Sequence, residues 1–147
     1  MMKKFALALL ALGLSGQVLA AETIELHRSE NCGCCLRWSA MMQKQGYSVV
    51  DHVETDMRSI KEQAKIPQQV RSCHTAQLKG YVFEGHVPVM DMRSLLKAAP
   101  KDVIGLAVAG MPKQAPGMGD PAKPAENIDV MAIHQDGSLS LYHHYSD

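Results

Sequence analysis

The chain has 147 residues, with 15 basic and 15 acidic side chains, so its formal net charge is zero when histidine is neutral. This length is sufficient for one domain with a single core. Lysine and arginine are not concentrated in any stripe, which argues against nucleic acid as a partner.

The first twenty residues have the three parts of an export signal. Met1–Lys4 is positively charged, Phe5–Leu14 is apolar, and Val18–Ala20 places small residues before the expected cleavage point. The apolar run is too short to span a bilayer comfortably. We therefore predict a signal peptide over residues 1–20, which is removed, and a single periplasmic domain over residues 21–147. No later apolar run is long enough to span a membrane, so we expect no membrane association after cleavage.

The first half of the mature chain alternates between strand and helix patterns. Period-two alternation, helical spacing and β-branched residues predict, in chain order, strand Thr23–His27, helix Cys34–Gln45, strand Tyr47–Val53 and a helix from Asp56 to about Lys65. Asp56 is the candidate N-cap of the second helix.

The middle of the chain is less regular. We expect a short turn over Gln68–Thr75 and a short strand over Tyr81–Phe83. Asp91 is the expected cap of a helix over Met92–Ala99. Glycine and proline are then so frequent over Gly105–Glu126 that this stretch predicts a long loop.

The chain ends in a predicted hairpin, with strands Ile128–His134 and Leu139–Tyr145 around the turn Asp136-Gly137. The order of the elements predicts an α/β fold, a thioredoxin-like sandwich with cysteines at the first strand-to-helix junction. Gly105–Glu126 would be an irregular, Pro/Gly-rich insertion before the C-terminal hairpin.

The sequence Cys32-Gly33-Cys34-Cys35 places three thiols in four positions. A disulfide between adjacent Cys34 and Cys35 would be strained, and one between Cys32 and Cys34 would close a very tight ring. The feasible redox disulfide therefore joins Cys32 and Cys35. A helix start at this point would favour thiolates. Clustered thiolates that pair poorly with one another are good ligands for soft metals such as Cu(I).

Cys73 is the only cysteine outside this motif. It either forms a structural disulfide with one of the other three, as is common in exported proteins, or joins them on a metal. Histidine and methionine are further candidate copper ligands, above all His74, His86, Met111 and Met118. The alternative is that these histidines are structural and that these methionines cover apolar surface.

Four motifs in this order resemble the CopG family of periplasmic copper-resistance proteins. They are Cys32-Gly33-Cys34-Cys35, then Ser72-Cys73-His74-Thr75, then Gly85-His86-Val87-Pro88, then Gly110-Met111-Pro112 with Pro116-Gly117-Met118. The resemblance spans the chain from about Glu22 to Tyr145. One departure is Ala109, where similar sequences tend to have proline.

The resemblance implies a thioredoxin-like domain whose four cysteines, Cys32, Cys34, Cys35 and Cys73, hold a multinuclear copper–thiolate cluster. His86 and Met118 are carried over as further ligands. The resemblance also implies a role in copper resistance, by changing the oxidation state of copper or by passing copper to another periplasmic copper-handling protein. Whether such a protein is an enzyme stays open.

Other functions fit parts of the pattern. A thioredoxin-type thiol–disulfide oxidoreductase would use Cys32 as the attacking thiolate and Cys35 as its partner, although Cys34 would offer competing pairings. A copper carrier or buffer would bind without turnover. Structural zinc sites usually use two separated Cys-X-X-Cys pairs, and this chain lacks the second pair. An iron–sulfur cluster fits the ligand type, but an exported chain seldom meets cluster assembly.

Overall fold

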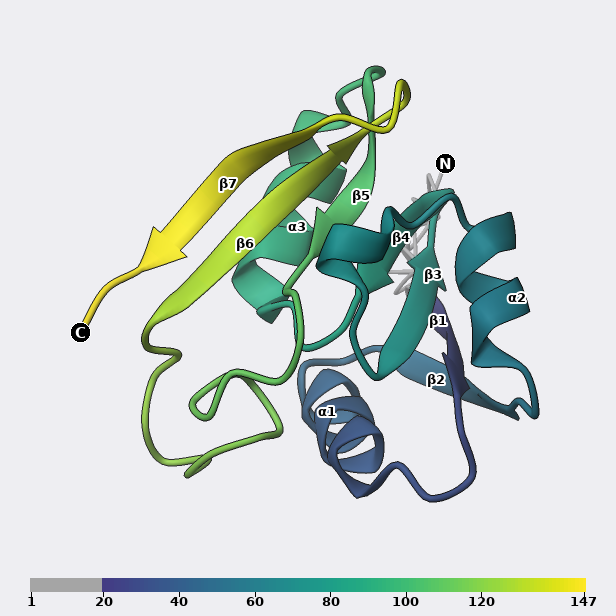
Figure 1. Cartoon of the computed structure of the whole chain (residues 1–147). Coiled ribbons are helices and arrows are strands. Elements are labelled where there is room, and N and C mark those ends of the chain that lie inside the picture. The colour runs from purple at the N-terminus through teal and green to yellow at the C-terminus, as the bar shows by residue number, and fades with distance from the viewer. Residues whose placement is uncertain (1–19) are drawn as a thin grey trace, which may run out of the picture.

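The computed structural model describes residues 20–147, which form one mixed β-sheet covered by helices on both faces (Figure 1). The signal peptide predicted over residues 1–20 lies outside the described residues except for Ala20. Within the described range, no helix is long and apolar enough to cross a membrane.

The helices and strands follow one another with short connections until the last third of the chain. In chain order they are β1 Thr23–Arg28, α1 Gly33–Lys44, β2 Ser48–Val53, α2 Met57–Gln63, the 3-10 helix η1 Gln68–Val70, β3 His74–Leu78, β4 Tyr81–Glu84, α3 Val89–Ala98, β5 Val103–Ala107, β6 Ile128–His134 and β7 Leu139–Tyr145. Residues 108–127, called the irregular segment below, contain no helix or strand.

The seven strands lie in the order β2-β1-β3-β4-β5-β6-β7. β1 is parallel to β2, β4 is parallel to β5, and the other neighbours are antiparallel. The carboxyl end of β1 therefore meets the amino end of β3. This register pairs Arg28 with His74, and so brings the two segments that carry the cysteines together.

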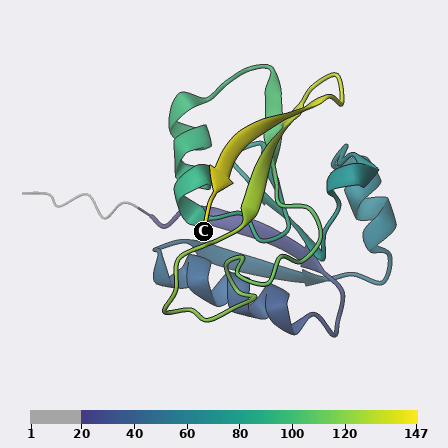
Figure 2. The same ribbon diagram turned by 60° about the vertical axis from the view of Figure 1, so that its left-hand side comes forward.

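Helices α1 and α3 cover one face of the sheet, and α2 with η1 covers the other (Figures 1 and 2). The larger core lies on the α1 side, where Trp38 of α1, Leu26 of β1 and Leu95 of α3 are fully buried. Burying each such side chain contributes roughly 1.5–3 kcal/mol. This packing fixes the amino end of α1 against the sheet.

The structure confirms most of the predicted helices and strands, and it confirms Asp56 as the N-cap of α2, where its side chain accepts a hydrogen bond from the backbone of Ser59. The prediction that Asp91 caps a helix is wrong. Helix α3 begins three residues earlier, its N-cap is Pro88, and Asp91 is buried within the first turn. The buried carboxylate of Asp91 instead accepts hydrogen bonds from His143 and Tyr145 of β7.

Two further expectations need correction. The stretch predicted as a turn over Gln68–Thr75 contains η1 and the beginning of strand β3, which the sequence pattern did not reveal. The loop predicted from Gly105 begins only after Ala107, because Gly105 lies inside β5. A Cβ atom at Gly105 would lie 1.9 Å from the carbonyl oxygen of Val82, so glycine here allows close approach of β4.

Candidate metal centre

The loop that leads into the first three cysteines is held by Arg28, the last residue of β1. Arg28 is 7% exposed and donates two hydrogen bonds to the carboxylate of Asp51 on β2, at 2.8 and 2.7 Å. Its remaining Nη1 group donates to the carbonyl oxygens of Ser29 and Glu30, at 3.1 and 2.9 Å. A rigid, charged guanidinium thus fixes the backbone two residues before Cys32.

Helix α1 begins at the cysteine motif, as the sequence predicts. Cys32 is the N-cap, and Cys34 and Cys35 lie in the first turn. Cys32 and Cys35 form a disulfide with a Cα–Cα distance of 5.3 Å, which is the pairing expected from their spacing. Cys35 is fully buried and Cys32 is 9% exposed. Cys34 remains a free, half-buried thiol.

Cys73 lies on the segment between η1 and β3, and a buried ion pair holds this segment in place. Glu84 of β4 is fully buried and lies 2.6 Å from the ammonium group of Lys61, which is itself 6% exposed. The same carboxylate accepts hydrogen bonds from the backbone of Ser72 and from the hydroxyl of Thr75, both at 2.7 Å. The residues on either side of the Cys73-His74 pair are therefore bonded to one carboxylate.

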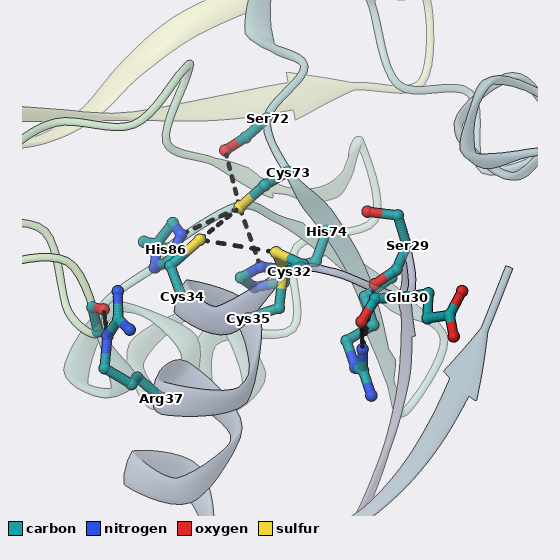
Figure 3. Close-up of a disulfide and its surroundings, with 12 residues drawn as sticks. Ser29, Glu30, Cys32, Cys34, Cys35, Arg37, Ser72, Cys73, His74 and His86 are labelled. Atoms are coloured by element: carbon teal, nitrogen blue, oxygen red, sulfur yellow. Dashed lines mark hydrogen bonds between the residues drawn. A yellow bond between two sulfur atoms is a disulfide. The ribbon is translucent and has the colours of Figure 1, made fainter.

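The four cysteine sulfurs converge on one point (Figure 3). The sulfurs of Cys32, Cys34, Cys35 and Cys73, called the four-cysteine cluster below, all lie within 4.8 Å of one another. The sulfur of Cys34 is 3.6 Å from that of Cys32 and 3.7 Å from that of Cys73. Sulfur ligands of a tetrahedral metal ion lie about 3.8 Å apart, given metal–sulfur bonds of about 2.3 Å, so these spacings suit a shared metal.

Two histidines contact Cys73 from the core side. Its sulfur is 3.0 Å from Nε2 of His86 and 3.4 Å from Nδ1 of His74. Both rings are fully buried, and the ring of His74 packs against that of Trp38 with centroids 4.7 Å apart. Cys73, His74 and His86 form a second group whose ligand atoms lie within 4.8 Å of one another.

Burial sets the protonation of this second group. It raises the pKa of Cys73 to about 11, with a further contribution from the charge of Cys34. Burial also lowers the pKa of His74 well below its usual range, and it lowers that of His86. At neutral pH both imidazoles are therefore neutral, with a lone pair available to a metal, whereas the Cys73 thiol keeps its proton until a metal displaces it.

The irregular segment is hydrogen-bonded to the same region. Pro116 accepts a hydrogen bond from Nδ1 of His86 at 2.6 Å, and Gly117 accepts one from Nε of Arg37 at 2.8 Å. Gly110 accepts one from the hydroxyl of Ser72. These contacts place the segment beside the amino end of α1, where a Cβ atom at Gly117 would lie 3.2 Å from the carbonyl oxygen of Cys34.

The methionines predicted as further ligands are placed differently from one another. Met118 is half-buried and packs against the main core, one residue after the contact between Gly117 and Arg37. Met111 is 59% exposed, although its neighbour Gly110 contacts Ser72.

The donors fit a soft or borderline metal. Four sulfur atoms are ligands that Cu(I) and zinc prefer, and imidazole suits copper, zinc and other transition metals. The structure also contains one buried polar atom without a partner among the described side chains, Nε2 of His74. A buried, unsatisfied imidazole nitrogen requires an explanation in a native structure, and it belongs to the ring whose other nitrogen, Nδ1, is 3.4 Å from the sulfur of Cys73.

Sequence reasoning missed the residues that support this centre. The sequence pattern indicates no role for Arg28, Lys61 or Glu84; of the three, only Lys61 lies inside a predicted helix or strand. Buried charged side chains are rare unless they are paired, but the partner of each lies 23 residues away along the chain. Both pairs depend on how the chain folds and cannot be read from neighbouring residues, although Glu84 directly precedes the motif that contains His86.

Comparisons with known proteins agree with this picture. The family model described as "Protein of unknown function, DUF411" matches residues 70–118, and a search of curated proteins finds no match. Two solved structures are similar, described as "Copper resistance protein copG" Form 2 and Form 1. The first is 36% identical, with a TM-score of 0.78 and coverage of 85% of this chain and 98% of that chain. The second is 35% identical, with a TM-score of 0.79 and coverage of 86% and 99%.

Proposed function

Because the chain belongs to the CopG family of copper resistance proteins, we propose that it binds copper through its four-cysteine cluster and thereby contributes to copper resistance. The observation that carries this proposal is the convergence of the four sulfurs from two distant segments of the chain. With the disulfide reduced, four thiolates at this spacing can bridge ions, so we propose a multinuclear copper–thiolate cluster.

His86 and Met118 are the residues that we propose as additional copper ligands. The contact between His86 and the sulfur of Cys73 supports the first assignment, because both atoms could bind one ion without a large movement. The position of Met118 beside Gly117, close to the first turn of α1, supports the second. Glu84, two residues before His86, accepts a hydrogen bond from the backbone of Ser72, next to Cys73. Arg37 of α1 donates one to Gly117, next to Met118.

The fold and the cellular compartment of the protein determine what it could do with copper. We propose a thioredoxin-like fold, supported by the parallel β1–α1–β2 unit followed by the antiparallel pair β3 and β4, and export to the periplasm through residues 1–20. Copper there would be substrate or cargo. The protein would change its oxidation state or pass it to another copper-handling protein of the same compartment.

The test is metal content and thiol count. We expect the mature protein, reduced and loaded with Cu(I) without oxygen, to retain two or more coppers per chain. All four cysteines should resist alkylation until a Cu(I) chelator removes the metal. A Cys73→Ser variant should lose most of this copper, since each sulfur is shared. Retention of no copper by the reduced wild-type protein would refute the proposal.

A second candidate function is thiol–disulfide exchange, favoured by the Cys32–Cys35 disulfide at the start of α1. Reduced Cys32, the less buried of the pair, would attack a substrate disulfide, and Cys35 would then release the reduced substrate and close the disulfide. This activity should disappear in Cys32→Ser and persist in Cys73→Ser. A metal centre should instead be lost in both variants, so the pair of variants separates the two functions.

A further inference from the structure

We propose that Cys73, His74 and His86 form a second metal position, which takes a divalent ion such as Cu(II) and which persists when the Cys32–Cys35 disulfide has formed. The proposal rests on the proposed copper function, and it adds to the four-cysteine cluster a position whose donors are two imidazoles and one thiolate. Both positions share the sulfur of Cys73.

The spacing of the three ligand atoms suits one ion. A sulfur and a nitrogen on a tetrahedral metal lie about 3.5 Å apart, given bonds of about 2.3 and about 2.0 Å. The sulfur of Cys73 lies 3.4 Å from Nδ1 of His74 and 3.0 Å from Nε2 of His86. The rings of the two histidines are 5.0 Å apart and nearly perpendicular, so small rotations can direct both toward one ion.

Neighbouring groups form hydrogen bonds that orient these ligands. His86 donates its Nδ1 proton to the carbonyl oxygen of Pro116, which leaves Nε2 as the metal-facing atom. Glu84 accepts a hydrogen bond from the backbone of Ser72, and Lys61 donates one to the hydroxyl of Thr75, so both sides of the Cys73-His74 pair are held. The buried Nε2 atom of His74 has no hydrogen-bond partner in the described structure, and Nδ1, which lies beside the sulfur of Cys73, is the metal-facing atom of this ring.

The Cys32–Cys35 disulfide affects the four-cysteine cluster but not the donors of the second position. It removes two of the four sulfurs from the four-cysteine cluster but leaves the Cys73 thiol and both imidazoles unchanged. Two imidazoles and one thiolate form a donor set that proteins use for Cu(II) as well as Cu(I), whereas thiolates alone select Cu(I). The oxidised protein should therefore bind a divalent ion at the histidine-containing position only.

The experiment uses the mature protein with the Cys32–Cys35 disulfide and two free thiols verified by peptide mapping. Co(II) is the probe, because it does not oxidise the remaining thiols and its absorption reports sulfur ligation. We expect one Co(II) per chain with a sulfur-to-cobalt charge-transfer band. His74→Gln and His86→Gln should each weaken binding by about tenfold or more, and the exposed control His144→Gln, at a residue paired with Asp129, should leave it unchanged.

His74 is buried, so its variant is first checked for folding by thermal unfolding. X-ray absorption of Co(II) bound to the wild-type protein provides a test that needs no variant, and it should show both imidazole and sulfur ligation. Absence of Co(II) binding, binding that is unchanged in both folded histidine variants, or a cobalt ion without imidazole ligands would overturn the second position. If the reduced protein still binds Cu(I), the proposed function survives that result. If the reduced protein binds no Cu(I), the proposed function fails.

Discussion

Nδ1 of His86 lies 2.6 Å from the carbonyl oxygen of Pro116. A carbonyl oxygen can only accept a hydrogen bond, so Nδ1 carries the proton and Nε2 keeps its lone pair. Nε2 lies 3.0 Å from the sulfur of Cys73. The irregular segment therefore sets the tautomer of a residue in the candidate metal centre, in the way that backbone carbonyls commonly orient imidazole ligands.

This relationship predicts the tautomer of His86 in the metal-free protein. Nitrogen-15 NMR of the imidazole rings should identify His86 as neutral and protonated at Nδ1 at pH 7, because burial disfavours the charged form. His144, which is exposed, provides a reference ring in the same spectrum. A His86 ring protonated at Nε2 would contradict the proposed orientation toward a metal.

A second prediction concerns the buried ion pair. Lys61→Met should lower the free energy of unfolding by about 3–5 kcal/mol, because the carboxylate of Glu84 would remain buried without its counter-ion. Lys79→Met is the matched control, since Lys79 pairs with Glu22 at an exposed position, and it should cost less than about 1 kcal/mol. Chemical denaturation of the metal-free protein measures both losses. Equal losses would show that the buried Lys61–Glu84 pair contributes no more to the free energy of unfolding than an exposed pair.

A third prediction concerns Gly85, which adopts a φ of +71° between Glu84 and His86. A Cβ atom there would lie 2.6 Å from the side chain of Ser72 and from the carbonyl oxygen of Val108. Gly85→Ala should therefore displace the segment that carries Cys73, and cost about 1–3 kcal/mol beyond the strain of the left-handed backbone.

Gly80→Ala is the control for that strain, because Gly80 has a φ of +81° and nothing within 4 Å of its Cβ position. It should lose only about 1–2 kcal/mol of stability, with Cu(I) binding unchanged. Denaturant unfolding and copper stoichiometry are measured for both variants. If the two substitutions have the same effect, the close packing of Ser72 on Gly85 does not position Cys73.

The fourth prediction is a pH dependence in the metal-free, disulfide-bonded protein. Burial, with a further contribution from Cys34, raises the pKa of Cys73 to about 11 from an ordinary value of 9.0. The reactive thiolate is therefore scarce at pH 8, and alkylation of Cys73 should accelerate as the pH rises toward 11. The raised pKa also stabilises the fold below pH 9, and this contribution should be lost as the pH passes through 11.

Peptide mapping after timed alkylation follows Cys73 separately from Cys34. The Cys34→Ser variant should shift the profile of Cys73 to lower pH, because it removes a neighbouring negative charge. A profile of Cys73 with its midpoint near the ordinary pKa of 9.0 would contradict the burial of this sulfur against Cys34 and the two histidines.

The local sequence predicted where the first three cysteines lie in the fold and which two of them pair, because these features depend on one short motif. The start of α1 at Cys32-Gly33-Cys34-Cys35 follows from the change of hydrophobic period after β1, and the Cys32–Cys35 pairing follows from ring size. The convergence of Cys73 with these residues could only be expected from its chemistry. The structure explains it through the register of β1 and β3, which pairs Arg28 with His74.

Features that depend on distant partners were not predictable from the local pattern. Asp91 has the sequence context of a helix cap, yet it is buried against His143 and Tyr145, more than fifty residues later in the chain. Gly105 has the context of a loop, yet it lies in β5, where the lack of a side chain allows β4 to approach closely. Strand β3 begins at a histidine and carries polar Thr75, whose burial depends on the Lys61–Glu84 pair.

The most direct test of the copper proposal is X-ray absorption at the copper edge of the reduced protein loaded with Cu(I). We expect sulfur to dominate the ligands of copper, with additional scattering from neighbouring copper, and we expect both signals to be lost in Cys73→Ser. Copper coordinated by nitrogen and oxygen alone, with the same spectrum in Cys73→Ser as in the wild-type protein, would contradict a cluster built on the four cysteines.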